Sequence, residues 1–189
     1  FEAKNKILFG QNQQYDFYFD SEGIKNKDGL ILKNEDILLP GIHNKANYTA
    51  AISAVFPYIS KEAIIKVAKN FGGVEHRIEF VRELDGVKYY NDSIATSPTR
   101  VLAGLNSFNQ KLIVIAGGYD KHIPYEPMVP YVLQKVEKLL LCGATAEKIK
   151  AAVINDKNYN GTPEIIEVED IAEAVEYAHK NTKEGDIVT

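Results

Sequence analysis

From residue 98 onwards, short apolar runs alternate with stretches of helical periodicity, and this alternation limits the fold more than any other feature. The apolar runs lie at residues 112–116, 138–142, 165–168 and 186–188. They are mostly apolar along their length, as expected for strands that are buried on both faces. Such strands separated by helices indicate a parallel sheet between two helical layers. We therefore predict an α/β fold with a Rossmann-like, mostly parallel sheet and helices on both faces.

The helices between these strands are predicted from apolar residues spaced three or four apart. Ser97 and Pro98 provide an N-cap and a first turn, and Val101, Leu102 and Leu105 follow on one face. Further helices are expected at residues 131–134, 149–153 and 171–177.

A β-hairpin is predicted ahead of this region. The sequence alternates in a β manner from Ile78 to Leu84 and again over residues 87–91, and Asp85-Gly86 between them is typical of a two-residue turn. The chain therefore enters the parallel sheet through an antiparallel pair.

The first 70 residues have a different pattern. Short strands are predicted at residues 6–9, 15–19, 30–32 and 37–39. A helix starts near His43, with a buried face formed by alanines together with Val55 and Tyr58. Ser60 then caps a second helix, which Phe71-Gly72-Gly73 ends. We predict two domains, residues 1–70 and residues 71–189.

Composition excludes several classes of function. There are 22 Lys and Arg against 26 Asp and Glu, a net charge of −4, which argues against a nucleic-acid coat. A single cysteine leaves no disulfide framework and fits a reducing compartment. No apolar run approaches the roughly 20 residues of a membrane helix. We expect a cytoplasmic protein that binds neither nucleic acid nor membrane.

Two groups of polar residues lie in the first part of the framework. His43, Asn44 and Asn47 stand at a helix start, where the amides can either cap the backbone or pair with the edge of a purine. Arg77 follows Gly72-Gly73, and its planar fork suits a phosphate. The alternative for this second group is a domain linker with a surface arginine.

Two further groups follow predicted strands. Residues 91–98 bring a carboxylate, hydroxyls and a helix start together where parallel sheets bind ligands, although an ordinary capping turn has the same residues. Gly117-Gly118 can form an amide nest for an anion, with Lys121 adding charge. The alternative is a turn that needs positive φ beside a solvated lysine. Neither G-x-G-x-x-G nor the Walker pattern occurs in the sequence.

Taken in order, the four groups resemble motifs of the Mur ligase family. Members of that family carry the motifs His-Asn-x-x-Asn, Gly-x-x-His-Arg-x-Glu, Asn-Asp-Ser-x-Ala-Thr and Gly-Gly-x-x-Lys. The third motif is similar to that of the members that add D-glutamate, since their siblings carry Asp-Tyr-Ala-His there. The matching residues are His43, Asn44 and Asn47; Gly73, His76, Arg77 and Glu79; Asn91, Asp92, Ser93, Ala95 and Thr96; and Gly117, Gly118 and Lys121.

The resemblance implies that residues 1–70 are the C-terminal portion of a central ATPase domain. Residues 71–189 would then be a truncated C-terminal, Rossmann-like ligase domain. The implied activity is ATP-dependent addition of D-glutamate to UDP-N-acetylmuramoyl-L-alanine through an acyl phosphate, in peptidoglycan synthesis. ATP and Mg²⁺ are the implied cofactors, with the metal ligands outside this chain. We expect a monomer whose partners are these small molecules, and no activity from this chain by itself.

The resemblance also implies roles for single residues on the nucleotide side. Asn44 and Asn47 would contact the base region, Arg77 the ATP phosphates and Asp92 the ribose. No residue of this chain is implied as a metal ligand.

On the substrate side, the resemblance implies that Ser93, Thr96 and Lys121 bind substrate, with Thr96 and Lys121 holding carboxylates of D-glutamate. His76, Arg77 and Lys121 would be the catalytic residues.

Two positions depart from the family pattern. Ile94 occupies a position where many members have Lys, so one cation is missing, and Tyr119-Asp120 replaces the commoner Asp-Gly.

Two alternative functions stay open. One is a related ATP-dependent ligase acting on another amino acid or a folate, and the other is a non-catalytic nucleotide-binding α/β module.

Overall fold

The computed structural model describes residues 6–189, which form two compact units. The first unit ends at Gly73 and the second runs from Val74 to Thr189. None of the helices within residues 6–189 is long and apolar enough to cross a membrane.

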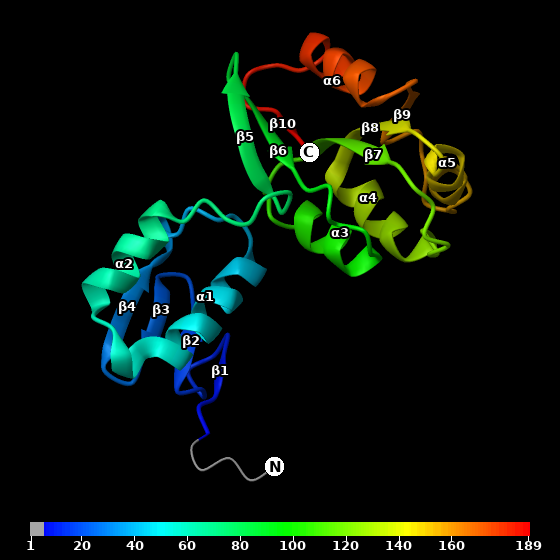
Figure 1. The fold of residues 1–189 in the computed structure, drawn as a ribbon. Helices are drawn as coiled ribbons and strands as arrows, with labels where there is room; N and C mark the ends of the chain where they lie inside the picture. The colour runs from blue at the N-terminus through cyan, green and yellow to red at the C-terminus, as the bar shows by residue number, and fades with distance from the viewer. Residues whose placement is uncertain (1–5) are drawn as a thin grey trace. The chain divides into compact units, whose positions relative to one another are not determined.

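The first unit is a small sheet packed against two helices (Figure 1). Strand β1 is parallel to β2, and β2, β3 and β4 are antiparallel. Apolar side chains of β2–β4 and of both helices make its core. The elements are β1 (Phe9–Gly10), β2 (Phe17–Phe19), β3 (Gly23–Asn26), β4 (Gly29–Lys33), η1 (Asn34–Asp36), α1 (Ile42–Val55), η2 (Phe56–Tyr58) and α2 (Lys61–Asn70).

Several expectations for this unit need correction. Residues 37–39 are not a strand, because the backbone N–H of Ile37 closes the 3₁₀ turn η1 by donating to Asn34 O. Strand β3 was not predicted, since its Gly23 reads as a breaker and its polar residues mask the alternation. The first two strands are also shorter than predicted, each two or three residues long.

Helix α1 forms where predicted, but its buried face agrees only in part with the predicted one, since Ala46 packs against the core. Val55 and Tyr58 are exposed, whereas Thr49, Ile52 and Ser53 are buried. The two hydroxyls need no partner outside the helix, because Thr49 Oγ1 donates to Lys45 O (2.7 Å) and Ser53 Oγ to Ala50 O (2.8 Å). Sequence periodicity counts such residues as polar and therefore leaves them out of the buried face. In α2, the predicted cap is confirmed, as Ser60 Oγ accepts from Ala63 N (3.3 Å).

The second unit contains the predicted parallel sheet. Its strand order is β5-β6-β10-β7-β8-β9, and only the β5–β6 pair is antiparallel. Asp85-Gly86 is the turn of that hairpin, and both residues have positive φ as a primed turn requires. The elements are β5 (Glu79–Leu84), β6 (Val87–Asn91), α3 (Pro98–Leu105), β7 (Leu112–Gly117), η3 (Glu126–Met128), α4 (Val129–Lys135), β8 (Val136–Cys142), α5 (Ala146–Ile154), β9 (Glu164–Glu167), α6 (Ile171–Lys180) and β10 (Ile187–Val188).

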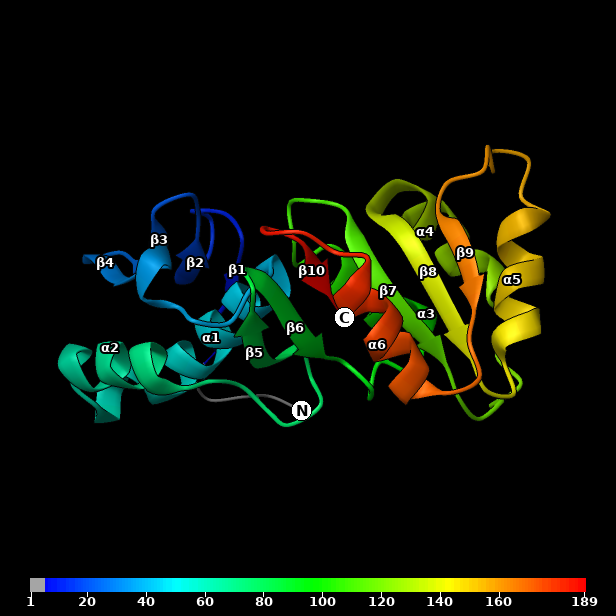
Figure 2. The ribbon, with the colours of Figure 1, turned by 90° about the horizontal axis from the view of Figure 1, so that it is seen from above.

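Helices cover both faces of this sheet, as predicted. Figure 1 shows α6 on one side of β7 and β8 and helices α3 and α4 on the other. Figure 2 shows α5 beside β9 at the end of the sheet. Leu139 and Leu141 of β8 pack in the core under α3–α5, and Leu140 between them packs in the core under α6. Successive residues of β8 thus face two cores, which explains why residues 139–141 are all apolar.

Candidate functional site

A cavity of about 740 Å³ lies in the second unit at the carboxyl ends of β6 and β7. Strand β10 lies between these two strands, so the loops after β6 and β7 leave on either side of it. Ligands in open α/β sheets bind at such places. Four of the predicted site residues line the cavity, namely Asp92, Ser93, Thr96 and Lys121.

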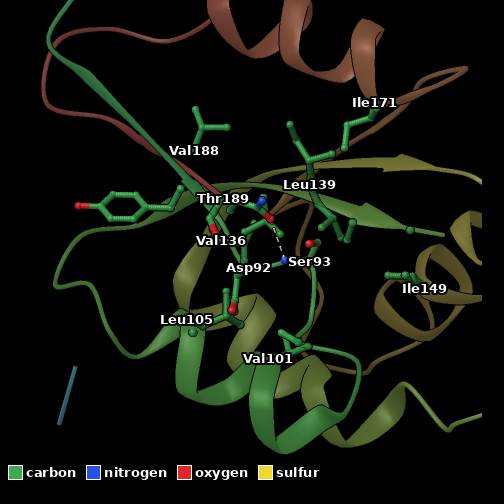
Figure 3. Close-up of a pocket in the computed structure, with 18 of the residues that line it drawn as sticks. Asp92, Ser93, Val101, Leu105, Val136, Leu139, Ile149, Ile171, Val188 and Thr189 are labelled. Atoms are coloured by element: carbon green, nitrogen blue, oxygen red, sulfur yellow. Dashed lines mark hydrogen bonds between the residues drawn. The ribbon is translucent and has the colours of Figure 1, made fainter. Parts of the chain in front are cut away.

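Most of the cavity wall is apolar. Figure 3 shows Asp92 and Ser93 in the middle of it, with Val101 and Leu105 of α3 on one side. Residues of all the strands of the sheet except β9, and of α4, α5 and α6, also line it. A few polar groups in an apolar surround are typical of sites for small molecules.

Asp92 is a polar group of the cavity whose carboxylate is held by the backbone before β5. Its Oδ1 accepts from the backbone N–H of Ile78 (3.1 Å). Burial raises the pKa of the Asp92 carboxyl above its usual value, although the Ile78 N–H, Arg77 and Arg100 act in the opposite direction. Arg100 was not singled out from the sequence, and its Nη1 also donates to Ile94 O (3.3 Å).

Gly104 explains how the Asp92 carboxylate can lie against a helix. A Cβ at this buried position of α3 would lie 2.6 Å from Asp92 Oδ2. Glycine is unfavourable inside a helix by roughly 0.5–1 kcal/mol relative to alanine, so its presence here is informative. The isolated glycine in a helical pattern was the one sequence signal that could have revealed this contact.

We expect Gly104→Ala to destabilise the protein by about 1 kcal/mol, because the carboxylate must move and Ile78 N–H loses its acceptor. The sign should reverse in an Asp92→Ala background, where Gly104→Ala is expected to stabilise by roughly 0.5–1 kcal/mol through helix propensity. Urea unfolding of the four proteins measures both effects. The same sign in both backgrounds would contradict the contact.

The segment before β5 is held in an unusual backbone conformation. His76 has φ 63° and Ile78 has φ 47°, and Arg77 lies between them with an exposed side chain. Asn91 Nδ2 lies 2.9 Å from His76 Nδ1, and Ile94 N donates to His76 O (3.3 Å). The structure thus brings His76 and Arg77 beside the loop after β6, although neither lines the cavity.

At the end of β7, Gly117 and Gly118 lie close to the backbone of strand β8, and Lys121 follows them. Gly117 has φ 151°, and Gly118 has φ 110° and donates its N–H to Cys142 O (3.3 Å). The predicted amide nest therefore lacks the Gly118 donor, because the neighbouring strand β8 already uses it.

Lys121 is exposed at the edge of the cavity and has no hydrogen-bond or ion-pair partner within residues 6–189. The neighbouring Asp120 instead pairs with Lys148 of α5 and accepts from His122 N (2.8 Å). The Lys148 ammonium, as the main cause, lowers the pKa of the Asp120 carboxyl. This pair, which sequence reasoning missed, ties the loop that carries Lys121 to α5.

Asn44 and Asn47 belong to the first unit. Asn44 Nδ2 donates to Pro40 O (2.7 Å), and Asn47 Nδ2 lies 3.5 Å from Asn44 Oδ1. Neither amide caps a backbone N–H in these contacts, and Asn47 is exposed. Within residues 6–189, no three His, Cys, Asp or Glu side chains are grouped so that they could hold a metal ion.

Comparison with protein families decides what kind of domain this is. The family model described as "Mur ligase, glutamate ligase domain" matches residues 76–189, more than half of the chain. The chain belongs to the Mur ligase family. The match begins at His76, so it covers the cavity and the constrained segment beside it but not Asn44 or Asn47.

Curated Mur ligases align with the whole chain. It is 46% identical over 190 residues to the UDP-N-acetylmuramoylalanine–D-glutamate ligase of Clostridium beijerinckii and 49% identical over 191 residues to that of Clostridium acetobutylicum. Each alignment covers 100% of this chain but only 40% and 39% of those enzymes. The chain thus spans about two fifths of the length of these relatives.

Solved structures share the fold at much lower identity. The chain is similar to the UDP-N-acetylmuramate–alanine ligase of Thermotoga maritima, with a TM-score of 0.71 and 16% identity over 96% of this chain and 43% of that one. It is also similar to the bifunctional folylpolyglutamate/dihydrofolate synthase of Yersinia pestis, with a TM-score of 0.65 and 16% identity over 92% and 41%. These likenesses confirm the α/β fold predicted from the sequence.

Proposed function

We propose that this chain is part of an ATP-dependent ligase that adds D-glutamate to UDP-N-acetylmuramoyl-L-alanine in peptidoglycan synthesis. The observation that carries the proposal is the identity of 46–49% to relatives named as D-glutamate ligases, over the whole of this chain. We propose a cytoplasmic monomer with small-molecule partners.

In the proposed reaction, the terminal carboxylate of the UDP-sugar attacks the γ-phosphorus of ATP, which gives an acyl phosphate and ADP. The amine of D-glutamate then attacks the acyl carbon, phosphate leaves, and the nitrogen loses a proton. No protein nucleophile is needed, so the residues of this chain act by positioning and by stabilising charge.

Asp92 and Arg77 are the proposed nucleotide contacts of the second unit. The partly buried carboxylate of Asp92 suits a sugar hydroxyl, which can donate to it. The exposed guanidinium of Arg77 suits phosphate oxygens. Asn44 and Asn47 are proposed to meet the base region from the first unit, which we propose to be part of the central ATP-binding domain.

The D-glutamate side is proposed to be the cavity edge formed by Ser93, Thr96 and Lys121. Lys121 has no ion-pair partner in the described residues, so its ammonium can bind a carboxylate of the substrate without losing another contact. Residues 6–189 do not contain a cluster suited to Mg²⁺, so we propose that the metal ligands lie elsewhere in the ligase.

The test is phosphate release by the complete ligase that contains this chain. We expect release with ATP, Mg²⁺, UDP-N-acetylmuramoyl-L-alanine and D-glutamate together, and only background release when L-glutamate or L-alanine replaces D-glutamate. Turnover with a pteroate substrate and L-glutamate would instead favour a folate ligase. Nucleotide binding without any turnover would favour a non-catalytic module.

A further inference from the structure

The conformation around Arg77 is held from outside its own segment. His76 and Ile78 both have left-handed φ, at 63° and 47°. This region is disfavoured for residues with a side chain, and most of all for a β-branched residue such as isoleucine. A strained conformation persists only where its surroundings fix it, so the contacts of these two residues decide where Arg77 stands.

Most of those contacts come from the end of β6 and the loop that follows it, while the His76 N–H donates to Glu79 Oε2 (2.8 Å) at the start of β5. His76 meets Asn91 through its ring nitrogen (2.9 Å) and Ile94 through its carbonyl (3.3 Å). Ile78 donates its N–H to Asp92 (3.1 Å), and its side chain is buried in the core. We call these residues, His76, Ile78, Asn91, Asp92 and Ile94, the clasp.

The hydrogen-bond network assigns the direction of the Asn91 amide. Its Oδ1 accepts from Ser93 N (3.1 Å), so its Nδ2 must face His76 Nδ1 and, at 3.5 Å, Glu79 Oε2. An amide nitrogen only donates, and therefore His76 Nδ1 is the acceptor and the neutral ring carries its proton on Nε2. Asn91 thus connects the backbone N–H of Ser93 with the imidazole of His76, the residue before Arg77.

We propose that Asn91 is a positioning residue that acts through His76 to fix Arg77 at a constant spacing from Asp92. The inference rests on the proposed function, in which Arg77 meets the phosphates and Asp92 the ribose of one nucleotide. A single rigid clasp would let one molecule bridge both residues without a further loss of backbone freedom on binding.

A double-mutant cycle in the complete ligase tests this coupling. We expect Asn91→Ala and Arg77→Ala each to raise KM for ATP by about tenfold. If Asn91 acts through Arg77, Asn91→Ala should change KM for ATP less than about twofold in the Arg77→Ala background. Asn181→Ala serves as the control and should leave KM unchanged, because that amide only bonds back to Tyr177 O in its own helix.

Two outcomes separate the failure of the clasp from the failure of the proposed function. Additive effects of Asn91→Ala and Arg77→Ala, or no effect of Asn91→Ala alone, would overturn the clasp and leave the nucleotide role of Arg77 intact. An unchanged KM for ATP in Arg77→Ala alone would instead overturn that role itself, and the positioning role of Asn91 with it.

The imidazole provides a readout that does not depend on activity. Nitrogen NMR of the wild-type ligase should show His76 with its proton on Nε2. In Asn91→Asp the carboxylate can only accept, so His76 Nδ1 should carry a proton and donate to it, even though an oxygen now stands where the amide nitrogen lay 3.5 Å from Glu79 Oε2. The contact should then be kept, and KM for ATP should stay closer to wild type than in Asn91→Ala. A wild-type ring protonated on Nδ1, or a ring unaffected by Asn91→Asp, would overturn the proposal.

Discussion

Replacing Gly117 by alanine is expected to destabilise the second unit by about 4 kcal/mol or more, which is a large share of the stability of an ordinary domain. Gly117 pairs with Cys142 at the end of β7 and has φ 151°. An added Cβ would lie 1.7 Å from Cys142 O and 2.8 Å from Cys142 C. Both atoms belong to the backbone of β8, which pairs with β7 and β9, so neither can move aside without breaking the β7–β8 pairing.

Gly118→Ala is the matched control in the same turn. Gly118 has φ 110°, but nothing lies within 4 Å of a Cβ built there. Its replacement should therefore cost only the backbone strain, about 1–2 kcal/mol. Urea unfolding midpoints of the two variants and the wild type measure the difference. Equal destabilisation by the two substitutions would show that the approach of Gly117 to β8 is not what the position requires.

The fold of the second unit could be predicted because its strands consist largely of apolar side chains that are buried in the sheet. Leu139, Leu140 and Leu141 are fully buried, and an apolar run of that kind fits only a strand between two layers. The first unit could not be predicted as well. Its buried Thr49 and Ser53 satisfy their hydroxyls within the helix, and strand β3 carries a glycine and an asparagine. In both cases a local hydrogen bond or a pairing strand overrides the periodicity of apolar residues.

The candidate site residues stay predictions, but the structure shows which of them lie together. Motif spacing identified Asp92, Thr96 and Lys121, which the structure places around one cavity. It could not identify Gly104 or Lys148, because both act on a partner far away in the sequence, Asp92 and Asp120 respectively. Nor could it indicate that Gly118 N–H is already bonded to the strand β8. Such contacts depend on tertiary packing, for which a single sequence carries little signal.

Lys121→Ala in the complete ligase is expected to raise KM for D-glutamate by about tenfold to a hundredfold, as for the loss of a charge-assisted contact to a carboxylate. KM for ATP and for the UDP-sugar should change little. The ammonium stands at the edge of the cavity, and the pair of Asp120 with Lys148 holds the loop in place without engaging Lys121. Measuring the three KM values in wild type and variant separates substrate binding from nucleotide binding.

Two further variants define what the lysine contributes. Lys121→Arg should restore the D-glutamate KM only in part, because a planar fork differs from a compact ammonium in shape and reach. Lys157→Ala removes an exposed lysine that does not line the cavity and has no hydrogen-bond or ion-pair partner in the described part of the chain, so it should leave all three KM values unchanged. If the loss in Lys121→Ala were confined to ATP, the lysine would belong to the phosphate site. If no KM changed, Lys121 would be a solvated loop residue, and the glutamate carboxylates would have to be bound by other groups of the cavity.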